Sequence, residues 1–319
     1  MSKTVVITGA SSGAGKAIAL AFAKKRESLV LASRNLAALQ EVADECQKLG
    51  ASVTIMACDV TEPGAMINLA AAASEVSGFI DVWVNNAGVL AVGAFDETPV
   101  EVLEQVIKTN LMGYIQGAHA VLPYFKKQGK GILINNISIG GFLPVPYGVG
   151  YSASKFGLRG FSAALKAELN AFPNIHVCDT FPAFLDTPGI QHAANYTGKQ
   201  LRPAPPVYDP MRVAQVIVKL TDHPQSETMI GSTSILLRLS YGLFPWITRA
   251  IAGSVIKGYF KHADEIAKTD GNVFNDVPYG NAVYGGWGIP GKPKAHRKYI
   301  TAGVLLGSFA LFSLLANKK

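Results

Sequence analysis

The sequence predicts a doubly wound α/β fold, in which helices cover both faces of a parallel sheet. Two observations predict it. Short apolar runs alternate with longer segments of helical periodicity to about residue 235, and a glycine-rich turn follows the first run. The composition suits a packed chain, because 49% of the residues are hydrophobic and only 16% are charged. A chain that is disordered as a whole is thereby excluded.

The expected strands are seven short apolar runs. They cover residues 5–7, 29–32, 53–57, 80–84, 132–137, 175–180 and 229–231, and the clearest helical segments are 16–25, 36–49, 154–172 and 210–221. In such a sheet the carboxyl ends of the strands share one edge, and ligands bind there where the strand order reverses. We therefore expect the functional residues in the loops that follow strands.

The turn after the first strand reads Thr-Gly-Ala-Ser-Ser-Gly-Ala-Gly-Lys over residues 8–16. Its glycines Gly9, Gly13 and Gly15 let the backbone turn tightly and let a pyrophosphate approach the next helix, whose N-terminus favours anions. A P-loop is excluded, because five residues separate Gly9 from Gly15 and Ala17 stands where Ser or Thr is required. Taken alone, the motif also fits a purely structural turn.

Further landmarks follow along the chain. They are Asp59-Val60 after the third strand, Asn-Asn-Ala-Gly at 85–88 after the fourth, and then Asn110, Ser138, Tyr151 and Lys155. Together with the Thr-Gly-x-x-x-Gly-x-Gly turn, this series resembles the short-chain dehydrogenase/reductase family over about residues 3 to 235. The resemblance implies a Rossmann fold and an enzyme that moves a hydride between a nicotinamide cofactor and a carbonyl or alcohol.

The resemblance also implies roles for individual residues. The catalytic residues would be Asn110, Ser138, Tyr151 and Lys155, and the cofactor would contact Gly9, Ser11, Ser12, Gly13, Gly15, Ser33, Arg34, Asp59, Asn86, Tyr151, Lys155 and Thr187. Within the family, Asp59 corresponds to an adenine contact, Lys155 also holds the nicotinamide ribose, and Asn110 anchors a water. We expect no metal site, because the six histidines are dispersed and the three cysteines lack paired spacing.

The spacing of Tyr151 and Lys155 also makes physical sense by itself. They are four residues apart, so on a helix they share one face. An unperturbed tyrosine pKa near 10 is too high for a proton relay at neutral pH, and a neighbouring ammonium should lower it. Tyr147 is a rival phenol, but its partner four residues later is Tyr151 rather than a cation. Ser138, which ends the fifth strand, can stabilise charge on the substrate oxygen by hydrogen bonding.

The choice of cofactor depends on the end of the second strand. An acidic residue there would bind the adenosine ribose hydroxyls and repel a 2′-phosphate, but this chain has Ser33 and Arg34. A guanidinium fits phosphate well, so NADP(H) is favoured over NAD(H). Two observations weigh against this reading: Ser12 stands where relatives often carry a second cation, and Arg34 also fits the role of a solvated cap.

One departure from the family pattern lies after the sixth strand. The family usually has Pro-Gly there, followed by a threonine that contacts the nicotinamide carboxamide. This chain reads Pro182-Ala183 and keeps Thr187, so the backbone at the nicotinamide end is less free to turn.

The segment from 189 to 209 falls where the family has its substrate lid. Residues that we expect to line the pocket are uncharged, namely Phe142, Val145, Tyr147, Phe184 and Leu185. They favour a lipophilic carbonyl or alcohol over a small charged acid, with ordinary loop packing as the alternative. Nucleic acid is not an expected partner, since the basic residues are scattered without interleaved aromatic residues.

We divide the chain into three parts. Residues 1–235 form the catalytic Rossmann domain, 236–295 a C-terminal extension on the substrate side or facing a membrane, and 296–319 a basic and apolar tail. Residues 300–316 carry no charge, which fits a helix that anchors the chain in a membrane, or else one buried in a homo-oligomer interface. The catalytic domain would then lie on the cytoplasmic side.

A different class of function remains as an alternative. A protein that binds NADP(H) as a sensor or scaffold would share the cofactor loop without turnover. The complete set of Ser138, Tyr151 and Lys155 argues against it, because a sensor has no need of a proton relay.

Overall fold

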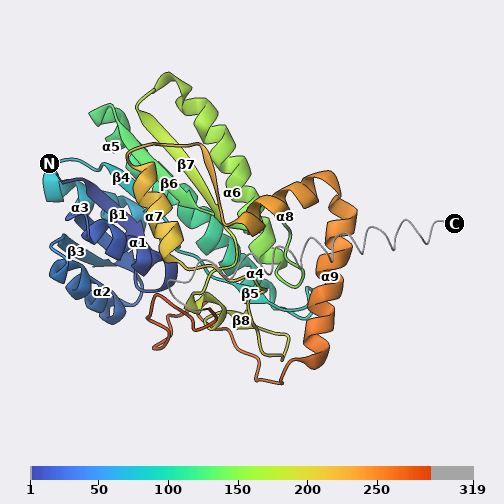
Figure 1. Ribbon diagram of the computed structural model, residues 1–319. Helices are drawn as coiled ribbons and strands as arrows, with labels where there is room; N and C mark the ends of the chain where they lie inside the picture. The colour runs from blue at the N-terminus through green and yellow to red at the C-terminus, as the bar shows by residue number, and fades with distance from the viewer. Residues whose placement is uncertain (1, 289–319) are drawn as a thin grey trace.

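The computed structural model describes residues 2–288, and its centre is a sheet of seven parallel strands (Figure 1). In sheet order the strands are β3 (Ser52–Ala57), β2 (Ser28–Ser33), β1 (Thr4–Thr8), β4 (Val82–Asn85), β6 (Gly131–Asn136), β7 (Ile175–Pro182) and β9 (Glu227–Ile230). All seven expected runs are strands, with ends that differ from the expected ones by at most two residues. The predicted doubly wound fold is confirmed, and its order reverses between β1 and β4.

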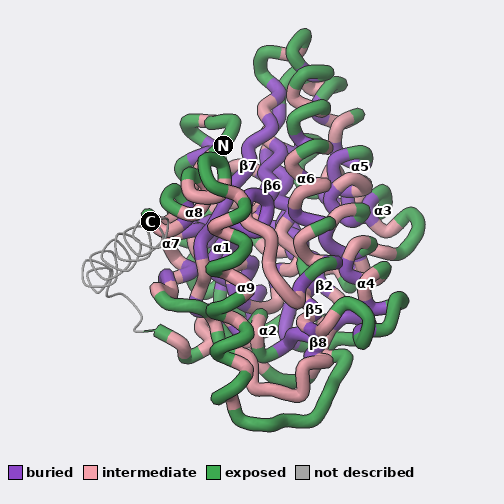
Figure 2. Tube along the Cα trace, turned by 90° about the vertical axis from the view of Figure 1, so that its right-hand side faces the viewer, coloured by how far each residue is buried: buried purple, intermediate pink, exposed green. Residues whose placement is uncertain are grey.

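Side chains of the central strand alternate between two hydrophobic cores, as the two-residue period of a strand requires. Val5 and Ile7 pack under α1 (Gly13–Ala23), α2 (Leu36–Lys48) and α7 (Met211–Leu220). Val6 faces the other way and packs under α3 (Ala65–Ser77) and α5 (Gly113–Gln128). Figure 2 shows the strands as the buried centre between these helices. Both faces of the sheet are therefore covered, which leaves its edges for binding.

Two more helices border the carboxyl edge of the sheet. α4 (Val100–Ile107) leads into α5, and α6 (Val149–Glu168) begins five residues before the expected segment 154–172, so it includes Tyr151. A short parallel pair, β5 (Ala91–Val92) and β8 (Ala194–Asn195), lies outside the main sheet and is not foreseen by the sequence pattern. Two-residue strands are too short to leave a periodic signal.

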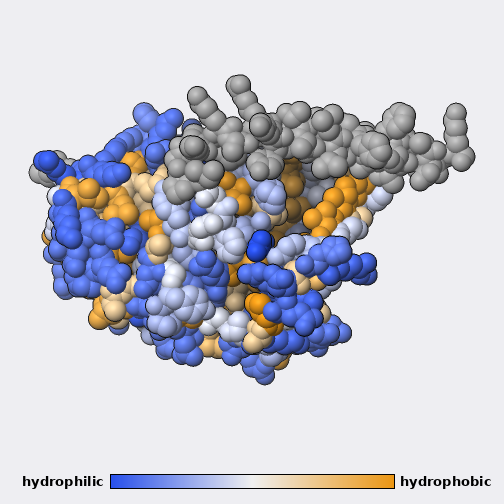
Figure 3. Space-filling view, turned by 60° about the horizontal axis from the view of Figure 1, so that its bottom comes forward, coloured by the Kyte–Doolittle hydropathy of each residue, from blue (hydrophilic) through white to orange (hydrophobic). Residues whose placement is uncertain are grey.

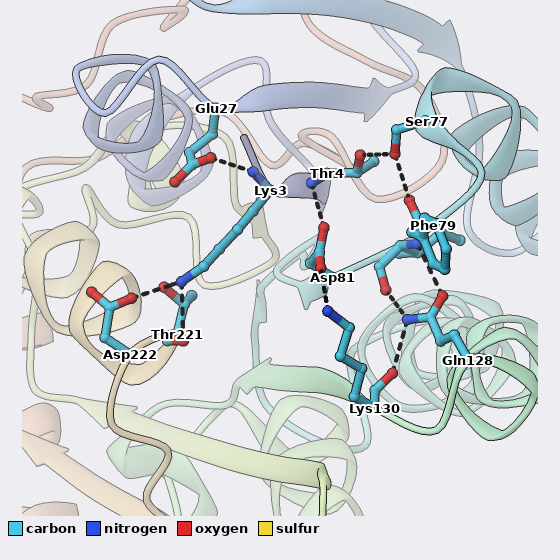
Figure 4. Close-up of polar contacts among 11 residues, drawn as sticks. Lys3, Thr4, Glu27, Ser77, Phe79, Asp81, Gln128, Lys130, Thr221 and Asp222 are labelled. Carbon is cyan, nitrogen blue, oxygen red and sulfur yellow. Dashed lines mark hydrogen bonds and ion pairs between the residues drawn. The ribbon is translucent and has the colours of Figure 1, made fainter. Parts of the chain in front are cut away.

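The amino edge of the sheet is tied by polar contacts (Figure 4). Lys3 Nζ pairs with Asp222 Oδ1 at 2.7 Å and donates to the Thr221 carbonyl at 3.2 Å, while the Thr4 amide donates to Asp81 Oδ2 at 2.9 Å. These contacts join the starts of β1 and β4 to the end of α7. They lie away from the loops that follow the strands, so we assign them a structural role.

After β9 the chain forms a helical arm and then returns across the molecule. The arm is α8 (Ser232–Leu243) and α9 (Pro245–His262), and α8 continues across residue 235, where the extension is expected to begin. Residues 264–288, which we call the strap, run back from α9 toward α1 and α2 (red in Figure 1). Within residues 2–288 no helix is long and apolar enough to cross a membrane. The apolar run 300–316 lies outside the described residues.

Candidate active site

The loops that follow β1 and β4 are held together by the residues of two sequence motifs. Thr8 Oγ1 accepts hydrogen bonds from the amides of Asn86 and Ala87, at 3.0 and 3.2 Å. Asn86 Nδ2 donates back to the carbonyls of Thr8 and Gly9, at 3.1 and 3.2 Å. Asn136, at the end of β6, then donates to Asn86 Oδ1 at 2.9 Å. The reversal point of the sheet is thus fixed by side-chain amides and one hydroxyl.

Two glycines of this turn leave no room for a side chain. A Cβ on Gly15 would lie 2.0 Å from the Gly9 carbonyl oxygen, and one on Gly9 would lie 2.7 Å from the Cα of Ala87. Gly9 also has a φ of 65°, which glycine adopts most easily. The first turn of α1 contains no acidic residue, and its N-cap, Ser12, makes no capping hydrogen bond through its side chain. This backbone cradle at a helix N-terminus fits a dinucleotide pyrophosphate.

Tyr151, Lys155 and Ser138 come together at the carboxyl edge of the sheet. Lys155 Nζ lies 5.7 Å from the centre of the Tyr151 ring, and the hydroxyls of Tyr151 and Ser138 are hydrogen-bonded. Gly140 makes room for the phenol, since a Cβ there would lie 2.8 Å from Tyr151 Cε1. Tyr147, the rival phenol, instead packs its ring 5.1 Å from that of Phe260 on α9.

Burial sets the protonation of this group. It raises the pKa of Tyr151 above its ordinary value, and the hydrogen bond with Ser138 acts in the opposite direction. Lys155 is only 4% exposed, and burial lowers its pKa to about 7. In the chain without a bound ligand, Tyr151 is therefore a protonated phenol at neutral pH. The sequence leads us to expect that Lys155 lowers this pKa, and for the chain without a ligand that expectation is wrong: burial raises the pKa, and the opposing effect comes from Ser138.

Ser138 is held in an unusual backbone conformation, with φ at 112°. Its Oγ accepts a hydrogen bond from the Gly140 amide at 3.1 Å, and its own amide reaches the Thr180 carbonyl at 3.4 Å. Positive φ is uncommon for a residue with a side chain and is concentrated at functional sites.

Asn110 lies in a π-helical turn, Lys108–Met112, that joins α4 to α5. Its buried side chain receives a hydrogen bond from the Val89 amide and donates one to the Val89 carbonyl, both at 2.8 Å, and it also reaches Ser154 Oγ at 3.3 Å. Single π-helical turns interrupt the ordinary helical ladder and are frequent at functional sites. Asn110 therefore links the loop after β4 to α6, on which Tyr151 lies.

The groups expected to select the cofactor have partners within the chain. Arg34 donates to the carbonyls of Asn272 and Phe274 in the strap, at 2.5 and 3.2 Å. Ser33 Oγ donates to the Asn35 carbonyl at 3.1 Å. Asp59 Oδ1 accepts hydrogen bonds from the amide and the hydroxyl of Thr61, both at 2.8 Å. Arg34 is thus neither a solvated cap nor a free guanidinium.

The strap continues past the glycine-rich turn to Asp186 and Thr187, which follow β7. The Gly13 amide donates to the Ala282 carbonyl at 2.9 Å. Asp186, 2% exposed, accepts hydrogen bonds from the amides of Gly285, Trp287 and Gly288, at 2.8 to 3.1 Å. Trp287 Nε1 donates to the carbonyl of Thr187 at 3.2 Å.

The sequence reasoning missed Asp186 and the partners of Arg34. The only sequence signal was the segment 270–288, whose resemblance to extensions of some bacterial short-chain enzymes argued against a random linker. Of the residues expected to line a pocket, Phe142 instead belongs to a buried cluster, with its ring 4.7 Å from that of Phe181. Within residues 2–288 no cluster of three or more His, Cys, Asp or Glu could hold a metal ion.

Comparisons with known proteins agree with this geometry. The family model of the short chain dehydrogenases matches residues 3–196. The chain is 32% identical over 267 residues to an uncharacterized oxidoreductase, YxnA, of Bacillus subtilis, covering 82% of this chain and 74% of the relative. An alcohol dehydrogenase of Thermococcus sibiricus, solved with 5-hydroxy-NADP, superposes with a TM-score of 0.63 at 28% identity, over 72% of this chain and 96% of that one. Actinorhodin polyketide ketoreductase, solved with NADPH, gives 0.65 at 27% identity, over 72% and 95%.

Proposed function

This chain belongs to the short-chain dehydrogenase/reductase family, and from that premise we propose that it interconverts a lipophilic ketone or aldehyde and its alcohol with NADP(H). As a member it is an oxidoreductase that uses a nicotinamide cofactor, which when bound supplies or takes up the hydride. The finer assignments rest on the residues of the site.

The observation that carries the proposal is the meeting of Tyr151, Lys155 and Ser138. In reduction, Tyr151 donates its phenolic proton to the developing alkoxide of the substrate. The Ser138 hydroxyl, hydrogen-bonded to the same phenol, stabilises charge on that oxygen. Lys155 stabilises the phenolate that remains, because its Nζ lies beside the Tyr151 ring. The raised pKa of Tyr151 keeps the proton in place until it is needed.

The cradle of Gly9, Gly13 and Gly15 would hold the pyrophosphate, with Asn86 and Asp59 at the adenosine side and Thr187 at the nicotinamide side. Supporting this, Gly13 and Thr187 face each other, since a Cβ on Gly13 would lie 3.3 Å from Thr187 Cβ. Because Arg34 is a cation, it favours NADP(H). A 2′-phosphate would have to share the guanidinium with the strap carbonyls or displace them. The Gly13 amide is shared with the strap in the same way.

The surroundings of Tyr151 support a lipophilic substrate. Its ring packs against a cluster of buried apolar residues that includes Val89, Ala91, Ala194 and Val273. An apolar substrate group packed against this cluster would be stabilised by burial, whereas an ionised group would lose its hydration there.

The direct test is the oxidation of NADPH, followed by absorbance, with a panel of lipophilic ketones and aldehydes. Turnover that depends on Tyr151 supports the proposal. NADPH binding without turnover of any carbonyl or alcohol would instead favour a sensor or scaffold. Lys155→Ala tests the double role of the lysine, because it should reduce both turnover and cofactor affinity.

For the tail, we propose that the uncharged run 300–316 anchors the chain in a membrane, with a helix in a homo-oligomer interface as the alternative. The support comes from the sequence alone: Arg297-Lys298 and Lys318-Lys319 flank the run, as basic residues flank membrane segments. Cell fractionation of the full chain and of a chain ending at Lys298 distinguishes the anchor from the interface helix. An anchor requires the full chain to stay with membranes at high salt, while an interface helix requires a defined oligomer in the soluble fraction.

A further inference from the structure

The α8–α9 arm exposes large apolar side chains. No residue of α9 is buried, and Figure 2 shows this helix as exposed and half-buried chain. At the junction of the helices, Leu243 is 69% exposed, Phe244 51% and Trp246 63%. In Figure 3 apolar side chains reach the surface on the right of the molecule, where Figure 1 places α9. Such a patch marks a surface that contacts something else.

The apolar residues of α8 form a continuous stripe. Exposed positions Ile235, Leu239 and Leu243 are four residues apart, so they follow one face of the helix and lead to the junction with Trp246. On α9, Ile251 and Val255 repeat the same spacing and are also exposed, while Tyr259, one turn later, donates a hydrogen bond to the Gln200 carbonyl at 2.7 Å. Both helices therefore present an apolar face that the rest of residues 2–288 leaves uncovered.

The charge of the arm is all of one sign. From Gly231 to Ala263 the chain has no Asp or Glu, but it carries Arg238, Arg249, Lys257 and Lys261. Arg238 is paired with Glu227 of β9, while Arg249, Lys257 and Lys261 lie on the exposed parts of α9. The strap that follows has the opposite character, with four acidic residues between 264 and 276. The arm is therefore apolar and positively charged, whereas the strap that follows it in the chain is acidic.

We propose that the α8–α9 arm binds the surface of a membrane that contains anionic lipids, with the junction residues in the headgroup region. An apolar face with Trp at its end and flanking cations is the composition of helices that lie in the interface. Anionic headgroups complement the cations, whereas a second copy of the same cationic arm would repel them across a two-fold axis. The proposal does not depend on the reaction that the enzyme catalyses.

The arm is also coupled to the site. Phe260 of α9 stacks edge-on against Tyr147, and Tyr241 of α8 does so against Phe156 of α6, with ring centres 5.1 and 6.4 Å apart. Tyr147 and Phe156 flank Tyr151 in sequence. A membrane under the arm would therefore lie beside the helix that carries the proposed acid, where lipid-dissolved carbonyls are concentrated.

Trp246 allows a test on the full chain that is independent of the tail. The chain has three tryptophans, of which Trp83 is fully buried and Trp287 is bonded to Thr187. We expect vesicles of phosphatidylcholine and phosphatidylglycerol that carry brominated acyl chains to quench the emission of the parent protein but not that of Trp246→Phe. Vesicle binding with equal quenching of both proteins would place the arm outside the lipid and overturn the proposal.

Two matched double variants complete the test. Leu239→Ser/Leu243→Ser should weaken the binding of the arm at least about tenfold, because each exposed leucine loses its partition into the interface. The quenching of Trp246 measures this, since total vesicle binding would also include any contribution of the tail. Ile67→Ser/Phe79→Ser, which changes two exposed apolar residues near α3, should leave binding unchanged. Replacing Arg249, Lys257 and Lys261 by Gln should weaken binding to anionic vesicles and remove most of its salt dependence. A parent protein that ignores vesicles but forms a dimer, which Leu239→Ser/Leu243→Ser dissociates, would show that a second copy covers the arm.

Discussion

The guanidinium of Arg34 donates a 2.5 Å hydrogen bond to the main-chain carbonyl of Asn272, a residue 238 positions later in the chain. The contact joins the end of β2, where a cofactor of this family would be selected, to the strap. A second donor of the same guanidinium reaches Phe274. The proposed selection of NADP(H) and the docking of the strap therefore involve the same side chain.

Replacing Arg34 by Asp should weaken both the binding of NADPH and the docking of the strap. We expect NADPH to bind about 2–4 kcal/mol more weakly, because a charge-assisted contact is lost and a like charge is added. NADH should lose much less, and limited proteolysis should cut the strap faster, since its carbonyls lose their donor. Arg34→Lys serves as the control that keeps the charge without the forked geometry. Equal losses for NADPH and NADH would show that Arg34 holds the strap but does not read the 2′-phosphate.

Asp186 is the second fixed point of the strap. Its buried carboxylate accepts three main-chain N–H groups, so Asp186→Asn would remove the charge and turn one acceptor into a donor. We expect faster hydrogen exchange at residues 285–288 and weaker cofactor binding, without loss of the fold. Glu265→Gln, which changes an exposed carboxylate of the same segment, should do neither. Unchanged exchange in Asp186→Asn would mean that the strap is held by other contacts.

The fold could be predicted because its strands are local apolar runs of the right period. The loops after β1 and β4 could be placed for the same reason, since strand ends determine where Gly9 and Asn86 lie. The strap could not be predicted, because Arg34 and Asp186 bind main-chain groups, which every residue carries. Contacts of this kind leave no pattern in the sequence.

The protonation states of Tyr151 and Lys155 also could not be predicted from the sequence alone. Spacing alone places Lys155 beside Tyr151 and predicts a lowered phenol pKa, but it gives no measure of how far either group is desolvated. Burial among Val89, Ala91, Ala194 and Val273 reverses the direction for Tyr151. The positive φ of Ser138 and the π-helical turn at Asn110 are likewise determined by packing between distant elements.

Tyr151→Phe keeps the ring but loses the transferable proton. We expect an intact fold, unchanged NADPH binding and turnover lower by about 100-fold or more. The variant Tyr147→Phe is the matched control, because its ring contact with Phe260 is preserved and its hydroxyl has no assigned role. Turnover near that of the parent at saturating substrate would remove Tyr151 from the proton relay.

The two directions of the reaction should differ in their dependence on pH. In the proposed relay, alcohol oxidation needs the phenolate of Tyr151, whose pKa burial raises, so its rate should keep rising from neutral into alkaline solution. Carbonyl reduction needs the protonated phenol, which persists over this range, but also the Lys155 ammonium, whose pKa burial lowers to about 7, so its rate should fall as the pH rises. The measurement is kcat in both directions as a function of pH. A plateau of the oxidation rate already at neutral pH would mean that Lys155 and the bound cofactor lower the phenol pKa after all.

The burial of Lys155, which its proposed role requires, should lower the free energy of unfolding of the chain. Its pKa is about 7 in the folded chain and 10.5 when unperturbed, so between these values the unfolded chain binds a proton that the folded chain does not. The free energy of unfolding therefore rises with pH across this window, and below it the folded chain bears the full cost of a buried ammonium, roughly 3–5 kcal/mol. Tyr114, whose ring centre lies 5.0 Å from Nζ, offsets part of that cost.

Lys155→Met removes the buried charge and keeps most of the volume. We expect the variant to be inactive. In the absence of cofactor it should be more stable than the parent at pH below 7, with the difference shrinking toward pH 10. Urea unfolding at several pH values measures this difference. Lys166→Met on the same helix is the control with the opposite sign. Lys166 pairs with the buried Asp179 at 2.6 Å, so its removal leaves a carboxylate without its cation and should destabilise the chain. If Lys155→Met lowered stability at acidic pH, the buried ammonium would have to be stabilised in the fold, and the direction of its pKa shift would be wrong.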